Sequence, residues 1–265
     1  MKKSIFRLSA ICFLVVSCGF GGACKKQETV KFVDGDPYTL NIASFNIGQG
    51  RFCEYDMKKI AKIIRSKNIE VVGLQEVDVN CARSNYKDLL KDLKKATGFK
   101  YSAFLPVQMI GSEGYMGNAV LSKYPIKEEE TENIKLPSSS SMARKLGKVT
   151  IDVGEYFFPF FVTHLSYEEK QARTKQFEKI SSILAEYDDY ILVGDFNTTD
   201  FSEYEIITNA NTVFSPTLTL PTHGETCIDN IVYAPVGWSF TPPETVQNNA
   251  SDHNMVYSTA TYLLK

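Results

Sequence analysis

The sequence lacks several features that would place it in a common functional class. Its 265 residues carry 29 Lys and Arg against 31 Asp and Glu, so the formal net charge is only −2. It has no stripe of Lys and Arg interleaved with aromatic residues, which a dedicated nucleic-acid-binding protein tends to carry. It also has no Cys-x-x-Cys pair, which disfavours a thiolate zinc site or thioredoxin-like chemistry. After the first residues, no apolar run is long enough for a membrane-spanning helix.

The start of the chain resembles an export signal. Three basic residues precede a mostly apolar run over 11–16, which is too short to span a bilayer. Val15-Val16-Ser17-Cys18 resembles a bacterial lipoprotein cleavage box, with Cys24 as a weaker candidate and simple secretion as the alternative. We therefore expect a lipoprotein-type signal and tether start over 1–24 and a linker over 25–38. The exported protein would be membrane-anchored, periplasmic or at the cell surface, and lipidated at Cys18 rather than Cys24.

Three cysteines fall within the expected mature domain. Export implies an oxidising compartment, in which disulfides persist. Cys53 and Cys81 each follow an expected strand, so the sequence fits either a disulfide between them or unpaired buried thiols. Cys227 has no evident partner.

Strand patterns outnumber helix patterns from residue 39 onward. Apolar or alternating runs predict strands over 39–45, 70–74, 119–122, 147–153, 156–163, 190–193, 230–233 and 255–262. Helical spacing begins after Asp56, near Tyr86 and after Ser166, where Ser166 and Glu169 match a capping box. The acidic run over 127–130 is typical of a solvated face or loop. This mixture predicts one α/β domain over 39–265, with two packed sheets flanked by helices.

Polar residues recur beside the expected strands. They are Asn46, Gln75-Glu76, Asn118, His164, Asp195 with Asn197, Asp229 and Asp252-His253. Each also fits a structural role taken alone: Asn46 as a turn residue, His164 as a core histidine, or Asp195 with Asn197 as an Asx turn. Two of only three histidines belong to the set, so together the residues indicate one site. If Asp195 and Asn197 stand at a strand tip, their spacing sends both side chains to one face.

These residue types suit phosphoryl transfer. Carboxylate and amide oxygens without thiolates favour a hard cation, Mg²⁺ or Mn²⁺, which neutralises phosphate charge and stabilises the leaving oxygen. A carboxylate–histidine pair provides proton transfer or an electrostatic clamp, and amide donors bind phosphoryl oxygens without adding charge.

Seven segments in order along the chain resemble the endonuclease/exonuclease/phosphatase superfamily. This superfamily includes pancreatic-type deoxyribonuclease, abasic-site endonucleases, neutral sphingomyelinases and inositol polyphosphate 5-phosphatases. The segments are "SFNIG", "VVGLQEVD", "YMGNAVLSKYPI", "VTHLS", "ILVGDFNTTD", "CIDNIVYAP" and "SDHNMVYS", within residues 39–262. The resemblance implies a four-layer α/β sandwich of two packed mixed β-sheets flanked by helices. The site would lie at the edge of the sheets.

The resemblance also implies roles for individual residues. Glu76 would be the main metal ligand, with Asn46 and Asp252 nearby. His253 would be the catalytic histidine, paired with Asp229.

The remaining implied roles concern the phosphate and the attacking water. Asp195 would orient or deprotonate the water, Asn197 would bind the phosphate, and His164 and Asn118 would contact the scissile phosphate. Arg144 stands where relatives often carry a phosphate-facing arginine, although an exposed surface arginine also fits. We interpret Arg173 and Gln176, one helical turn apart, as structural.

The chain departs from some nucleases of the family at Asp78. They carry an arginine two positions after the metal glutamate, and a carboxylate there would repel a DNA backbone. We therefore expect a monomeric Mg²⁺- or Mn²⁺-dependent phosphoesterase acting on a smaller or lipid-linked phosphoester. A nuclease, or an inactive lipoprotein that binds a phosphate ligand, is the alternative. The substrate, the choice between diester and monoester, and the number of metal ions stay open.

Overall fold

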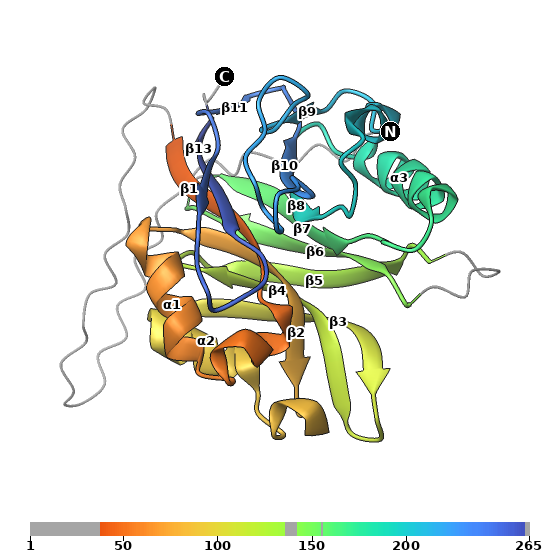
Figure 1. Cartoon of the computed structure of the whole chain (residues 1–265). Coiled ribbons are helices and arrows are strands. Elements are labelled where there is room, and N and C mark those ends of the chain that lie inside the picture. Colours follow the sequence, from red (N-terminus) through yellow and green to blue (C-terminus); the bar gives the residue numbers. More distant parts are fainter. Residues whose placement is uncertain (1–37, 136–141, 155, 263–265) are drawn as a thin grey trace, which may run out of the picture.

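The fold is a four-layer sandwich in a computed structural model that describes residues 38–135, 142–154 and 156–262. Two sheets pack face to face, with α1 (Met57–Ser66) and α2 (Leu89–Thr97) outside one and α3 (Lys170–Leu184) outside the other (Figure 1). This arrangement confirms the predicted fold class. No described helix has both the length and the apolar character needed to cross a bilayer.

Each sheet is mixed. One contains, in spatial order, β11 (Trp238–Phe240), β13 (Met255–Tyr262), β1 (Tyr38–Asn46), β2 (Val71–Val79), β4 (Gly114–Ser122) and β3 (Tyr101–Ile110), with β12 (Glu244–Val246) paired to β13. The other contains β5 (Ile126–Asn133), β6 (Lys145–Asp152), β7 (Phe157–His164), β8 (Ile191–Asp195), β10 (Asp229–Tyr233) and β9 (Asn211–Thr212). The described residues also form three 3₁₀ helices: η1 (Gly48–Cys53), η2 (Ala82–Ser84) and η3 (Phe201–Ile206).

Strands buried on both faces explain the near-continuous apolar runs. Val71 packs between the sheets, whereas its neighbour Val72 packs against α1 and α2. In β8, Val193 packs between the sheets and Leu192 packs toward α3. Successive side chains of a strand point to opposite faces, so both faces must be apolar when both are covered.

Strand direction brings the predicted polar residues to one edge. β1 and β2 are parallel, as are β7 and β8, so the carboxyl ends of each pair point the same way. β13 is antiparallel to β1 and β10 is antiparallel to β8, so both begin where those partners end. The ends of four strands and the starts of two therefore meet.

Some local predictions fail. Neither β3 nor β5 was predicted as a strand. The run over 127–130 lies in β5, an edge strand whose side chains are mostly exposed, which fits the predicted solvated face. The predicted capping box is wrong: α3 begins at Lys170, and the Glu169 side chain makes no capping hydrogen bond. Ser166 instead binds Gln176, which occupies its hydroxyl and backbone N–H. The three described cysteines are free thiols, so the unpaired alternative holds.

Candidate active site

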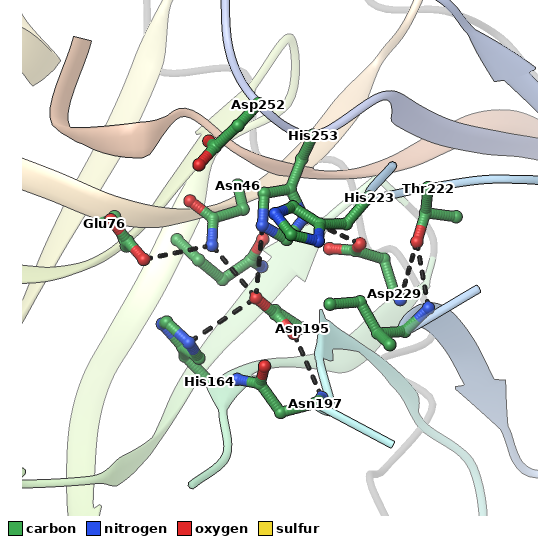
Figure 2. A network of polar contacts seen from close by, with 12 residues as sticks. Asn46, Glu76, His164, Asp195, Asn197, Thr222, His223, Asp229, Asp252 and His253 are labelled. Atoms are coloured by element: carbon green, nitrogen blue, oxygen red, sulfur yellow. Dashed lines mark hydrogen bonds and ion pairs between the residues drawn. The ribbon is translucent and has the colours of Figure 1, made fainter. Parts of the chain in front are cut away.

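Three polar side chains form a row across the six-stranded sheet. His164 ends β7, Asp195 ends β8 and Asp229 begins β10. The register places Asp195 directly beside both of the others. His164 Nε2 lies 3.5 Å from Asp195 Oδ2 (Figure 2). Strand pairing alone therefore puts a histidine and two carboxylates side by side.

His253 reaches this row from the other sheet, just before β13. Its Nδ1 lies 2.9 Å from Asp229 Oδ2, and its Nε2 lies 3.7 Å from Asp195 Oδ2 (Figure 2). Thr222 positions the start of β10, because its hydroxyl accepts the backbone N–H groups of Ile228 and Asp229 at 3.0 and 3.1 Å. The imidazole is thus bracketed by two buried carboxylates.

Asn46 joins the two sheets at the same point. Its Nδ2 donates to Asp195 Oδ2 at 3.0 Å and to Glu76 Oε1 at 3.3 Å. Its Oδ1 accepts the Gly48 N–H at 3.0 Å. Ser251 Oγ donates to the Asn46 carbonyl at 2.7 Å and so ties the loop before β13 to β1. Asn46 therefore connects the predicted metal ligand to the predicted water-orienting carboxylate.

The surroundings separate the protonation states of the ionisable groups. Burial, with the nearby charge of Asp229, raises the pKa of Asp195. Burial alone would lower the pKa of His253, but the charge and hydrogen bond of Asp229 outweigh it and raise that pKa to about 9. Burial and the positive charges of Arg144 and His253 lower the pKa of His164 well below its usual value. At neutral pH His253 is therefore an imidazolium and His164 is neutral.

Glu76 reaches the site through a β-bulge. Leu74 and Val77 both pack toward the helices, so two residues stand between them where regular alternation has one. The β2–β4 register shifts here, and Glu76 adopts a left-handed φ of 55°. The carboxylate then accepts Gln49 Nε2 at 2.6 Å as well as the Asn46 amide. A regular strand would not present it in this way.

The predicted metal ligands lie in an oxygen-rich corner. Glu76 and Asn46 are in contact, and the Asp252 carboxylate points toward their side of the network (Figure 2). Asp252 Oδ2 also accepts Arg51 at 3.1 Å. Two partly exposed carboxylates and an amide are hard oxygen donors, so this donor set fits Mg²⁺ or Mn²⁺. Glu76 and Asp252, with Asn46 between the sheets, are therefore the residues that could hold such an ion.

Clusters that include histidine lie beside this corner. Among the described residues, two groups of three have ligand atoms within 4.8 Å of one another: His223, Asp252 and His253, and Asp195, Asp229 and His253. Glu76 belongs to neither, because amide groups surround it.

Asn197 and Asn118 are held by backbone groups. β8 ends at Asp195, and Asn197 has a left-handed φ of 51°, so strand alternation does not align the two side chains. An Asx-type turn brings them together instead, with the Asn197 N–H donating to Asp195 Oδ1 at 3.0 Å. Asn197 Nδ2 donates to the Leu165 carbonyl at 2.9 Å. Asn118 Nδ2 lies 3.4 Å from the carbonyls of Lys145 and Val162, so it links the two sheets.

Arg144 is a buried cation, not the exposed surface arginine of the alternative interpretation. Only 3% of it is exposed, and its Nε–H has no hydrogen-bond partner among the described residues. Burial lowers its pKa, while the charges of Glu168, Asp195 and Glu76 act against that. An incompletely paired buried guanidinium is costly unless an anion approaches it.

Two other predictions have clear outcomes. Arg173 binds Glu203 through Nε and Nη2, both at 3.1 Å, and Gln176 binds Ser166, so both are structural as predicted. The expected repulsion by Asp78 is wrong, because Asp78 is fully buried and paired with Arg83 at 2.7 and 2.8 Å.

Several residues of the site were not predicted from the sequence. The His223 ring lies 4.6 Å from the His253 ring, and Gln49, Arg51 and Thr222 make the contacts described above. All four stand in loops or in η1, so no strand run marked them. The only sequence signal was that His223 is the third of three histidines.

Comparisons with known proteins bear on the fold and the family. A structure of an endonuclease/exonuclease/phosphatase family protein from Bacteroides thetaiotaomicron matches with a TM-score of 0.66 and 18% identity, over 86% of this chain and 100% of that one. A mannosyl-6-phosphatase of the same species matches with a TM-score of 0.61 and 18% identity, over 83% of this chain and 99% of the other. A humanized TDP2 of D. rerio matches with a TM-score of 0.64 and 19% identity, over 84% and 98%.

At such identities the structural matches establish the fold alone, and no curated protein matches the sequence. The family profile described as "Endonuclease/Exonuclease/phosphatase family" matches residues 39–253, which include every predicted site residue. The chain therefore belongs to the endonuclease/exonuclease/phosphatase family.

Proposed function

We propose that the protein is a Mg²⁺- or Mn²⁺-dependent phosphoesterase that hydrolyses its substrate with an activated water. The supporting observation is the Asp229–His253 pair at 2.9 Å, 3.7 Å from a second buried carboxylate, Asp195. Carboxylates and histidines that burial drives to different protonation states are typical of acid–base sites. A phosphatase and TDP2 among the structural neighbours are compatible with this chemistry.

The side chains divide the work of hydrolysis. Asp195, whose raised pKa suits a general base, takes a proton from water as the oxygen attacks phosphorus and the bond to the leaving oxygen breaks. The His253 imidazolium, held by Asp229, and the buried Arg144 supply positive charge to the phosphoryl oxygens. Neutral His164 and the Asn46 amide hold the Asp195 carboxylate in position. Asn197, whose backbone N–H binds Asp195, and Asn118 would be further phosphate contacts.

The metal ion would be held by Glu76 and Asp252, with Asn46 beside them. Bound there, such an ion neutralises phosphate charge and stabilises the leaving oxygen.

A substrate panel tests the activity. The purified protein is assayed with bis(4-nitrophenyl) phosphate, sphingomyelin, inositol phosphates, a sugar 6-phosphate, plasmid DNA and RNA, each with Mg²⁺, Mn²⁺ or chelator. We expect hydrolysis of a small or lipid-linked phosphoester that chelator abolishes. DNA and RNA belong in the panel because Arg83 neutralises the carboxylate that had argued against a nuclease. No hydrolysis of any substrate would favour the inactive phosphate-binding alternative.

Glu76→Gln tests the metal role. It keeps the size of the side chain but removes its charge, so we expect a folded protein that binds Mn²⁺ weakly, by calorimetry, and loses nearly all activity. Glu178→Gln is the matched control, because Glu178 is an exposed α3 carboxylate paired only with Lys175. Wild-type Mn²⁺ affinity in Glu76→Gln, or full activity in chelator, would remove Glu76 from this role.

We also propose export and lipid anchoring at Cys18, with the enzyme acting as a monomer. The support is the basic start, the short apolar run and the cleavage-box pattern, all outside the described residues. Mass spectrometry of the mature N-terminus is the test, with a diacylated Cys18 as the expected result. An unmodified start beyond Cys24 would indicate simple secretion, and an intact Met1 would contradict export. Light scattering of the delipidated protein tests the monomer.

A further inference from the structure

Beyond Glu76, β2 carries a buried carboxylate with one cationic partner among the described residues. Asp78 is fully buried, and both of its oxygens accept from Arg83: Oδ2 from Nε at 2.8 Å and Oδ1 from Nη2 at 2.7 Å. A buried carboxylate is stable only when it is paired in this way. The Arg83 side chain is itself 38% exposed, so the pair joins the protein interior to the surface.

Strand geometry puts this pair on the same face as the metal ligands. Val77 packs against the helices, so its neighbour Asp78 points to the opposite face of β2, where Gln75 also points. Two residues of fully extended strand span about 7 Å, and the bulge at Glu76 shortens the path, so Asp78 lies at most about that far from Glu76 along β2. The hydrogen bonds that Arg83 donates to Asp78 raise the pKa of Arg83, and the negative charges of Asp78 and Glu76 contribute as well.

The segment that carries Arg83 is braced from several sides. η2, the short gold helix beyond the end of β2 in Figure 1, lies in a loop closed by the Asn80 N–H, which donates to the Lys87 carbonyl at 2.9 Å. The Tyr55 hydroxyl donates to the Arg83 carbonyl, and Ser84 Oγ donates to the Cys81 carbonyl at 3.1 Å. The guanidinium is therefore positioned before any ligand arrives.

Only part of the guanidinium is used. Arginine has five N–H donors in a planar fork. Among the described residues, the Arg83 side chain donates only to Asp78, through one Nε–H and one Nη2–H. The outer edge of the fork is thus free to form charge-assisted hydrogen bonds with an anion, and such a fork matches the oxygens of a phosphate.

We propose that Arg83, anchored by Asp78, is a subsite for a second phosphate group of the substrate, beyond the one that is cleaved. The Asp78 carboxylate is neutralised by Arg83, and the pair fixes the Arg83 guanidinium beside Glu76, with its outer N–H groups unused by the described residues. The second phosphate could be a terminal monoester on a small molecule or the next diester of a nucleic-acid strand. The inference rests on the proposed phosphoesterase function, because Glu76 and Asp195 define where the first phosphate lies.

Three thymidine 5′-(4-nitrophenyl phosphate) esters test the subsite. They share a leaving group and carry a 3′-hydroxyl, a 3′-phosphate or a 3′-linked thymidine phosphodiester. We expect the wild type to hydrolyse the better of the two 3′-phosphorylated esters with a kcat/KM about tenfold above that of the 3′-hydroxyl ester. The gain should come from a lower KM, and its size is what one charged hydrogen-bonding contact provides. Whichever of these two esters is hydrolysed better shows whether the second phosphate of the natural substrate is a monoester or a diester.

The variants assign that preference to Arg83. Arg83→Gln combined with Asp78→Asn keeps a hydrogen-bonding pair without leaving a buried charge. For this double variant we expect the preference, which is the ratio of kcat/KM for the 3′-phosphorylated ester to that for the 3′-hydroxyl ester, to fall to about one. Arg83→Lys should keep part of the preference. The matched control Arg65→Gln changes an exposed arginine of α1 whose side chain binds only the Ala96 carbonyl among the described residues, and it should keep all of the preference. A wild type without preference, or an unchanged preference in the folded double variant, would overturn the proposal.

A binding measurement separates the two proposals. Calorimetry with thymidine 3′,5′-bisphosphate and thymidine 5′-phosphate, in chelator, needs no catalysis. We expect the bisphosphate to bind about tenfold more tightly to the wild type and equally to the double variant. If no ester is hydrolysed but this difference appears, the phosphoesterase proposal fails and the subsite stands. Equal binding to the wild type would refute the subsite whatever the activity.

Discussion

At the scale of single residues, Asp195 is the carboxylate that both histidines and the Asn46 amide approach. One of its oxygens accepts the Asn197 N–H, and the other faces Asn46, His164 and His253. All of these groups face one carboxylate that burial destabilises when charged. In the proposed mechanism Asp195 exchanges a proton, whereas Asp229 holds His253 and, through its charge, helps to raise the pKa of Asp195.

Asp195→Asn and His253→Ala should each lower kcat by about 10²- to 10⁴-fold, because each removes a proton-transfer or charge-stabilising group. Thermal stability should change little. The double variant should be scarcely worse than the poorer single variant, because residues that act as one unit are non-additive. Steady-state kinetics on the best panel substrate is the measurement. A single variant that keeps more than about a tenth of wild-type kcat lies outside this range, and its residue is then not catalytic.

Asp189, in the turn before β8, affects stability in a pH-dependent way. Burial raises its pKa to about 6 in the folded protein, so the fold disfavours its charged form. The cost is absent below the unfolded pKa of about 4 and develops as pH rises toward 6. Asp189→Asn should therefore raise the free energy of unfolding by about 1 kcal/mol at pH 7.5, a value reduced for the partial exposure of the side chain.

Urea unfolding of wild type and Asp189→Asn at pH 4.0 and 7.5 gives this comparison. The difference between the two proteins should be near zero at the lower pH. Equal differences at both pH values would show that the carboxylate is not destabilised by burial.

At the scale of elements, the two sheets approach closely at Gly73 in the middle of β2. A Cβ atom there would lie 2.2 Å from Val193 Cγ2 and 2.9 Å from Val162 Cγ2, across the interface between the sheets. This lack of a side chain lets β2 and β8 pack face to face. The close approach of β2 to β8 at Gly73 also fixes the distance between the two sheets at the edge where the site lies.

Gly73→Ala should destabilise the protein by about 1–3 kcal/mol, the usual cost of overpacking a filled core. Val193→Ala removes the clashing methyl groups, so the double variant should be more stable than the sum of the single changes predicts. Denaturant unfolding of the three variants measures this coupling. Additive changes would mean that the contact between Gly73 and Val193 is not limiting.

At the scale of the whole molecule, the site exists only when both sheets are joined. Asn46 in one sheet binds Asp195 in the other, 149 residues away, and His253 binds Asp229 across the same interface. No disulfide supports the described fold, in which Cys53 and Cys81 are buried. Apolar packing must therefore hold the site together: the core between the sheets, the core under α1 and α2, and the core under α3.

The thiols report on this packing. Burial raises the pKa of Cys53 and Cys81, so both should resist alkylation in the native protein and react once it is unfolded. Iodoacetamide labelling followed by peptide mass mapping gives the reactivity of each. The melting temperature should not depend on reductant. Recovery of a Cys53–Cys81 disulfide peptide from non-reduced protein would contradict this description.

Much of the site could be read from local sequence pattern. His164, Asp195 and Asp229 adjoin apolar runs that are strands, and strand ends in a mixed sheet meet at an edge. Their convergence therefore follows once the strands pair in the observed order. The sandwich was predictable for the same reason, because strands covered on both faces must be apolar throughout.

The sequence by itself determined the eight predicted strands, the helices' buried faces and the polar residues beside those strands, because alternation and helical spacing depend on near neighbours. It did not reveal β3 or the exposed edge strand β5. Tertiary structure alone decided the Glu76 bulge, the approach of His223 to His253 and the pairing of Asp78 with Arg83. In each case a loop conformation or a left-handed residue sets where the side chain goes, and packing between distant segments selects that conformation. The position of Asp78 shows how the two kinds of information differ. In the sequence Asp78 suggests repulsion of an anion, whereas in the fold its charge is paired with Arg83, whose remaining donors carry the proposed phosphate subsite.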